Sequence, residues 1–224
     1  MNTSKFLLLV LLFSNPAWAC LNKIYPIDMD GLLAENKEKE LRYIKGINNA
    51  VDLIIAGQSQ KAIEVLTALE KDSPGRYETA SNLGTAYELD GLLDDALIWI
   101  KKGIKINPDS HDGTEWLHYE IIKAKQNLRL NSDWLNDNSI IDLNAVDSGK
   151  AMNGLVYQLG ERTKFVSPPN SIVADLFYLM GLIHHNEENL FLRDKAFKQS
   201  LKYSQLREEK IKLIKRKEML RLQL

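Results

Sequence analysis

Small and apolar side chains are spaced along the chain as packed helices require. Residues 77–89 and 94–106 have the pattern of two helices, separated by Gly91, which can adopt the left-handed conformation that ends a helix. Gly84 and Ala96 lack bulk, so the axes of these two helices can approach closely. The pattern predicts an antiparallel helical hairpin.

The hairpin pattern occurs twice, with a period of 34 residues. The matching small, bulky, glycine and proline positions are Gly84, Tyr87, Gly91, Ala96, Ile100, Gly103 and Pro108 in one copy, and Ala50, Leu53, Gly57, Ala62, Leu66, Leu69 and Pro74 in the other. The copy with Gly84 resembles the tetratricopeptide repeat, in which Leu-Gly is followed three positions on by an aromatic residue and then by alanine and proline. Ala80 and Ile100 replace the usual tryptophan and phenylalanine. The resemblance covers residues 43–110 and implies stacked helical hairpins.

Beyond these two copies the pattern weakens. Residues 111–128 continue as a helix, but Asp142 stands where the period places proline. Residues 131–170 are rich in turn-forming residues, which predicts an irregular connection around a short helix near residues 155–159. A third repeat therefore begins and degenerates.

A helical pattern resumes at Ser171 and predicts another degenerate repeat. Ala196 comes three residues later than the family spacing, which predicts a lengthened turn around residues 186–189. The last helix is expected to continue to Leu224, longer than a repeat requires. The predicted class is therefore all-α, with stacked antiparallel hairpins and an extended C-terminal helix. The predicted divisions are 1–19, a signal peptide; 20–42, an N-terminal segment; 43–130, repeats with a degenerate third unit; 131–170, the irregular connection; and 171–224, a degenerate repeat and basic helix.

The N-terminus has the plan of a secretory signal peptide. Lys5 precedes an apolar run over residues 6–13, which is too short to span a bilayer, and Ala17 and Ala19 suit signal peptidase. Cys20, the only cysteine, stands where a bacterial lipoprotein carries its lipid. We expect an exported, periplasmic protein that begins at Cys20, either lipid-anchored there or cleaved in the ordinary way.

Charge is segregated along the chain although the formal net charge is only -1. Residues 20–194 carry 18 basic and 27 acidic side chains, whereas residues 195–221 carry 10 basic and 3 acidic ones. The basic tail is interpreted as a solvated cap helix, an arm on the acidic body, or a patch for anionic lipid. Export and the scarcity of aromatic residues among the lysines argue against nucleic acid.

Motifs of catalysis and metal binding are not found in the sequence. His184 and His185 lie near two glutamates, and His111, Glu115 and His118 are expected to share one helical face, but neither group has the spacing of a known metal site. Hydrogen-bonded or solvated histidines are the preferred interpretation. We therefore predict no enzyme activity, no cofactor and no metal.

Stacked repeats form a concave surface, lined by the first helix of each pair, that suits a peptide or partner helix. The predicted partner-binding residues are Ile44, Ile47, Val51 and Ile54 on an apolar half and Glu78, Ser81, Thr85 and Glu88 on an acidic half. Alternatively, residues 21–40 or the C-terminal helix cover the isoleucines. Ile47 and Val51 replace polar side chains with which some family members clamp chaperone tails, which disfavours that partner class.

The predicted function is a protein-binding scaffold or adaptor of the bacterial cell envelope whose partner is another envelope protein or peptide. The alternatives are a membrane-associated structural protein, held on anionic lipid by its basic C-terminal helix, and an envelope enzyme with carboxylates brought together only by the fold. The oligomeric state is left open.

Overall fold

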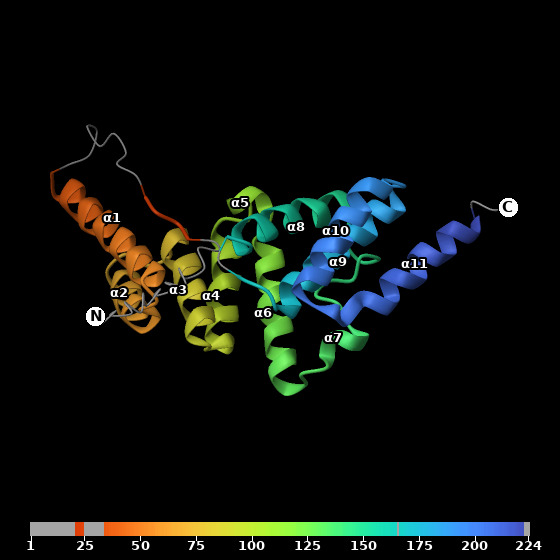
Figure 1. Cartoon of the computed structure of the whole chain (residues 1–224). Coiled ribbons are helices and arrows are strands. Elements are labelled where there is room, and N and C mark those ends of the chain that lie inside the picture. The colour runs from red at the N-terminus through yellow and green to blue at the C-terminus, as the bar shows by residue number, and fades with distance from the viewer. Residues whose placement is uncertain (1–20, 25–33, 165, 222–224) are drawn as a thin grey trace, which may run out of the picture.

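The computed structural model describes residues 21–24, 34–164 and 166–221 (Figure 1). Regular structure in these ranges is entirely helical, which confirms the predicted all-α class. The predicted signal peptide and Cys20 lie outside the described residues. Of the helices described, none is long and apolar enough to cross a membrane. They are α1 (Ala34–Ile55), α2 (Ser59–Asp72), α3 (Tyr77–Asp90), α4 (Leu93–Ile106), α5 (Ser110–Gly113), α6 (Glu115–Leu130), α7 (Trp134–Asp137), α8 (Ser148–Arg162), α9 (Ser171–Asn186), α10 (Leu190–Tyr203), a 3₁₀ turn η1 (Gln205–Arg207) and α11 (Glu208–Arg221).

Consecutive helices pack in adjacent pairs. Helix α1 packs on α2, α3 on α4 and α9 on α10, while α2–α3, α4–α6, α6–α8 and α8–α9 contacts join the pairs to one another. The helices follow one another across an elongated body, from α1 at one end to α11 at the other (Figure 1). The core is accordingly distributed along the array.

The hairpin of α3 and α4 forms as its small residues predict. A Cβ atom added to Gly84 would lie 2.5 Å from Cδ1 of Ile100 and 3.0 Å from the main-chain nitrogen of Ile100, so α3 and α4 touch at this glycine. Gly91 follows α3 with φ 83° and donates its amide hydrogen to the carbonyl oxygens of Tyr87 and Glu88. The helix bounds agree with the predicted ranges to within one residue.

The pair α9–α10 has the same register. Gly181 lies against the ring of Phe197 as Gly84 lies against Ile100. Glu188, with φ 58°, holds the left-handed position that Gly91 has in the earlier hairpin. Because α10 begins as far after Gly181 as α4 begins after Gly84, the predicted lengthened turn is wrong.

Arg193 explains why the spacing of Ala196 misleads. Arg193, not Ala196, holds the position that corresponds to Ala96, and its side chain is buried with 4% of its surface exposed. Its guanidinium pairs with Asp194 and with Glu218 of α11. A buried, ion-paired arginine thus occupies the position at which the sequence pattern requires a small residue.

The connection after α4 is more helical than predicted. Helix α6 begins at Glu115 instead of His111, because His111 and Asp112 have left-handed φ values of 50° and 56°. Helix α8 spans 15 residues, where a short helix was expected. Its Gly154 packs closely on Leu117 and Trp116 of α6, so the glycine that weakens the helical pattern provides the close approach.

The C-terminal helix is not continuous. Helix α10 ends at Tyr203, and Ser204 is extended with φ -165° and caps the 3₁₀ turn through its hydroxyl. Helix α11 then begins at Glu208 and runs in a different direction from α10 (Figure 1), and its Ile211 packs with Phe197. The expected single helix to the C-terminus is therefore wrong.

Candidate functional site

Residues 21–24 form a short non-helical segment that lies on α1 and α3. Asn48 of α1 accepts a hydrogen bond from the amide of Ile24 at 2.9 Å and donates one to the carbonyl oxygen of Ile24 at 2.8 Å. Asn82 of α3 makes the same two bonds to the main chain of Asn22, at 2.8 Å and 3.1 Å. Alternate residues thus present their main chain to two asparagines, as an extended chain does.

The side chain of Asn22 is bound as well as its main chain. Its Nδ2 donates to the hydroxyl of Ser81 at 3.0 Å, and its Oδ1 lies 3.1 Å from Nε2 of His111 in α5. We name the surface formed by Asn48, Ser81, Asn82 and His111 the segment site. The segment site binds Asn22 through both its main chain and its side chain.

Apolar contacts complete the docking of the segment. Leu21 and Ile24 pack against the core cluster of α1, α2 and α3. Lys23 pairs with the carboxylate of Asp52 at 2.6 Å on the exposed side. The segment therefore closes one edge of the cluster.

A buried charge network lies beneath the segment site. Glu115, 2% exposed, lies 2.5 Å from Nδ1 of His111 and accepts a hydrogen bond from the hydroxyl of Tyr77 at 3.2 Å. Its other carboxylate oxygen lies 3.5 Å from Nδ1 of His118. Burial would raise the pKa of Glu115, but hydrogen bonds from His111 and His118 outweigh it and lower the pKa to about 2.

Glu88 extends this network away from the segment. Its carboxylate lies 2.5 Å from Nε2 of His118, 2.5 Å from Nζ of Lys125 and 3.5 Å from Nη1 of Arg162. Burial alone would raise the pKa of Glu88, but the charges of these neighbours hold it well below its usual value. His118 therefore bridges two ionised carboxylates, Glu88 and Glu115.

The predicted apolar surface is covered. Helix α1 buries all four of its predicted partner-binding side chains, and each is at most 6% exposed: Ile44, Ile47, Val51 and Ile54. Ile47 and Ile54 belong to the cluster against which Leu21 and Ile24 pack. An open apolar face at these positions is therefore wrong for this structure, and for Ile47 and Ile54 the cover includes residues 21–24, part of the segment that the alternative interpretation named.

The predicted acidic half is mostly buried too. Ser81, Thr85 and Glu88 are each less than a tenth exposed, and only Glu78 is half-buried, with its carboxylate 3.5 Å from the hydroxyl of Tyr43. Ser81 contacts the segment, whereas Glu88 is neutralised by cations of its own chain. The predicted place of Glu88 on an acidic partner-binding surface is therefore wrong for this structure, because its charge is already paired within the chain.

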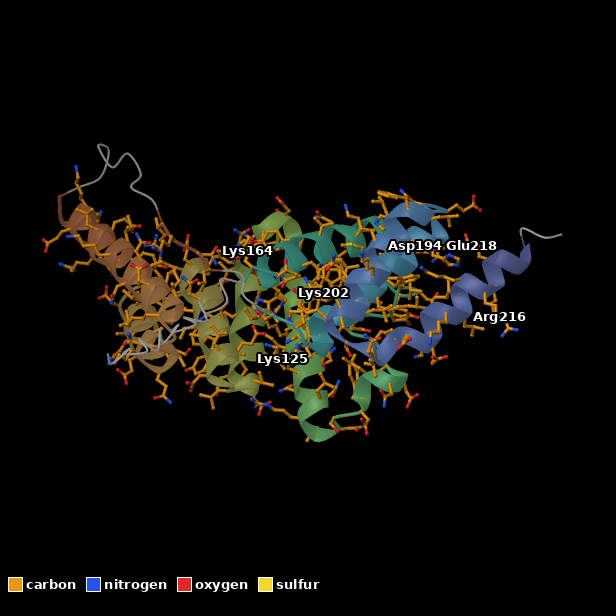
Figure 2. All side chains as sticks on the ribbon, in the orientation of Figure 1. Lys125, Lys164, Asp194, Lys202, Arg216 and Glu218 are labelled. Carbon is orange, nitrogen blue, oxygen red and sulfur yellow. The ribbon has the colours of Figure 1, made fainter. Side chains whose placement is uncertain are left out.

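The basic tail contacts the body at several points. Arg207, 1% exposed, pairs with Asp175 of α9 at 2.7 Å, and Lys215 pairs with Asp194 of α10 at 3.1 Å. Arg216 points away from the body in Figure 2, whereas Asp194 lies between α10 and α11. These contacts favour the docked-arm interpretation of the tail over lipid binding.

The chemistry of the buried network is that of charge pairing. Among the described residues, no group of three or more histidine, cysteine, aspartate or glutamate side chains could hold a metal ion. Glu88 borders a cavity of about 360 Å³ beside Lys125, but its carboxylate oxygens are already bonded. His111, Glu115 and His118 do meet, although His111 reaches Glu115 from α5 instead of from the helix of the other two.

No family model, curated protein or solved structure matches the chain. The site therefore rests on its own geometry. Sequence reasoning missed Asn48 and Asn82, although they stand one 34-residue period apart and the repeat offered a signal for them. The 34-residue period did not indicate that Asn48 and Asn82 would bind residues 24 and 22.

Proposed function

We propose that this chain is a tetratricopeptide-like adaptor of the cell envelope and that its segment site binds an extended segment of a partner protein. The observation that carries the proposal is the pair of asparagines, each of which binds both main-chain groups of one residue. Main-chain groups are the same in every extended peptide. A surface that holds residues 22 and 24 in this way can hold a foreign segment by the same bonds.

The recurring hairpin register supports the tetratricopeptide-like part of the proposal. Close approaches at Gly84 and Gly181, and left-handed turns at Gly91 and Glu188, repeat one geometry along the array. Export follows from the leader-like sequence, and lipid attachment at Cys20 is part of the same proposal. Cys20 directly precedes the docked segment in the sequence.

Residues 21–24 act in this proposal as an intramolecular ligand. A covalently linked segment has an effective concentration in the millimolar range, so a partner must bind more favourably or be held by further contacts. The site is consequently closed to weak, non-specific peptides. A partner displaces the segment and takes over its bonds to Asn48 and Asn82.

The experiment is cross-linking of partners in the cells that make this protein, followed by mass spectrometry. Replacement of Asn48 and Asn82 by alanine should remove the partner that cross-links to α1 and α3. Asn49→Ala is the matched control, because Asn49 is the exposed neighbour of Asn48. Equal capture by the double variant and by the control would overturn the proposed site.

A further inference from the structure

The segment site has a donor and an acceptor that match a primary amide. Ser81 Oγ lies 3.0 Å from Nδ2 of Asn22, and Nε2 of His111 lies 3.1 Å from Oδ1 of Asn22. The two protein groups differ in kind, a hydroxyl and an imidazole. Their hydrogen-bonding directions are set by what each binds on its other side.

Glu115 orients both groups. Its ionised carboxylate only accepts hydrogen bonds, and Oε1 lies 2.5 Å from Nδ1 of His111 and 3.5 Å from the hydroxyl of Ser81. The single hydroxyl hydrogen of Ser81 is thereby directed to Glu115, which leaves the oxygen of Ser81 to accept from the amide nitrogen of Asn22. Because Nδ1 of His111 donates to Glu115, Nε2 donates to the amide oxygen of Asn22 only when the ring carries both protons, as an imidazolium ion paired with Glu115. Tyr77 fixes the same carboxylate oxygen at 3.2 Å.

This arrangement disfavours aspartate and alanine at the position of Asn22. Aspartate has the same shape but no hydrogen to donate to Ser81, so one oxygen of its carboxylate would face the Ser81 oxygen, and its charge would compete with Glu115 for His111. Alanine would remove the bonds that Asn22 gives to Ser81, which is buried, and to His111, which is half-buried, and the loss of a bond to a buried polar group is costly. Leu21 and Ile24, which flank the amide, pack on the apolar cluster.

From this geometry we infer that the segment site recognises asparagine, and that the partner segment has the pattern apolar, asparagine, any residue, apolar. The inference deepens the proposed function and rests on it: Asn48 and Asn82 bind the main chain, while Ser81 and His111 choose the side chain. Residues 21–24 show this pattern as Leu-Asn-Lys-Ile. The positioning residue is Glu115, which acts through Ser81 and His111.

The test uses the full chain with Asn22→Pro, which removes both the amide hydrogen bound by Asn82 and the side chain bound by Ser81. The probes are fluorescent, N-acetylated and C-amidated peptides Leu-Asn-Lys-Ile, Leu-Asp-Lys-Ile and Leu-Ala-Lys-Ile. The asparagine peptide should bind about tenfold more tightly than either of the others, since two hydrogen bonds are at stake. The Lys23→Ala chain keeps its own segment docked and should bind all three peptides as weakly as the unaltered chain.

Two further substitutions place the selectivity in the site. In the Asn22→Pro chain, Ser81→Ala and His111→Asn should each reduce the preference for the asparagine peptide several-fold, with the affinity of the alanine peptide unchanged. Asparagine tolerates the left-handed backbone of His111, and circular dichroism checks that both chains fold. Equal affinities for the three peptides would overturn the recognition of asparagine but leave main-chain binding intact. If none of the three peptides bound to the Asn22→Pro chain, whether or not that chain also carried Asn82→Ala, the proposed function itself would be overturned.

Discussion

Asn48 and Asn82 occupy the same position of successive helical pairs and bind the main chain of residues 24 and 22, respectively. Successive helical pairs thereby bind alternate residues of an extended chain, whose side chains repeat every two residues. In the part of the chain that the structure describes, the side-chain hydrogen bonds of both asparagines go to this segment, and none joins α1 to α3. Both side chains are bound to a segment that other segments of similar backbone could replace.

Glu88 should be essential for stability although it lies away from the segment. Glu88→Ala would leave Lys125, Arg162 and His118 without their carboxylate, and breaking a buried ion pair costs about 3–5 kcal/mol. Urea denaturation measures this loss. The control is Glu64→Ala on the exposed side of α2, for which we expect a change below about 0.5 kcal/mol. Similar stabilities of the two variants would show that the network around Glu88 contributes little.

Stability should fall in acid because of Glu115. Its pKa is lowered to about 2, so its contribution is fully present above its unfolded pKa of about 4.5 and is lost as the pH falls towards 2. The contribution at neutral pH is about 3 kcal/mol at most. Glu115→Gln should therefore be less stable than the unaltered chain at pH 7, and the difference should close between pH 4.5 and 2. A difference that does not change with pH would contradict the ionised, paired state of Glu115.

The contact between Gly84 and Ile100 should not tolerate a larger residue. Gly84→Val forces α3 and α4 apart and should lower the free energy of unfolding by about 2–3 kcal/mol, with part of it recovered when Ile100→Ala makes room. Gly160 of α8 is the control, because nothing lies within 4 Å of an added Cβ there. Gly160→Ala should raise stability by about 0.5–1 kcal/mol. Thermal and urea denaturation measure both changes.

Arg207 should fasten the C-terminal helix to the body. Its guanidinium pairs with Asp175 and also donates to the carbonyl oxygens of Asn136 and Asn138, so Arg207→Ala removes several buried bonds and should cost about 3–5 kcal/mol. Limited proteolysis should cut the variant near α11 first. Arg216→Ala, on the outward side of α11 in Figure 2, should behave as the unaltered chain does. Equal protease resistance of the two variants would show that Arg207 does not fasten α11 to the body.

The sequence predicted the hairpins best where packing depends on glycine. Gly84 and Gly91 are distinctive because a close approach of two helices excludes larger side chains and a left-handed turn favours glycine. The later hairpin repeats this geometry with Glu188 at the left-handed position and Arg193 at the small position, so its register was misread. Arg193 pairs with its neighbour Asp194 and with Glu218 of α11, and the pair with Glu218 is not visible in a local pattern.

The candidate site was harder to predict than the fold. Helix α1 has apolar side chains on more than one side, and its sequence does not show which of them the rest of the chain covers. Ile47 and Val51 were therefore placed on an open surface that the tertiary structure closes. Asn48, between them in sequence, is the residue that binds the segment, and its correspondence to Asn82 becomes informative only when the ligand is seen.

Amide hydrogen exchange at Asn22 and Ile24, measured by NMR on the unaltered full chain, tests the central claim most directly. Both amides donate to asparagine side chains in the structure, so both should be protected. Saturation with the Leu-Asn-Lys-Ile peptide should accelerate their exchange at least about tenfold, because the peptide displaces the segment, while exchange at Gly91 and Leu92 stays the same. Unchanged protection of Asn22 and Ile24 while the peptide is bound would contradict the account, since the peptide would then occupy another site.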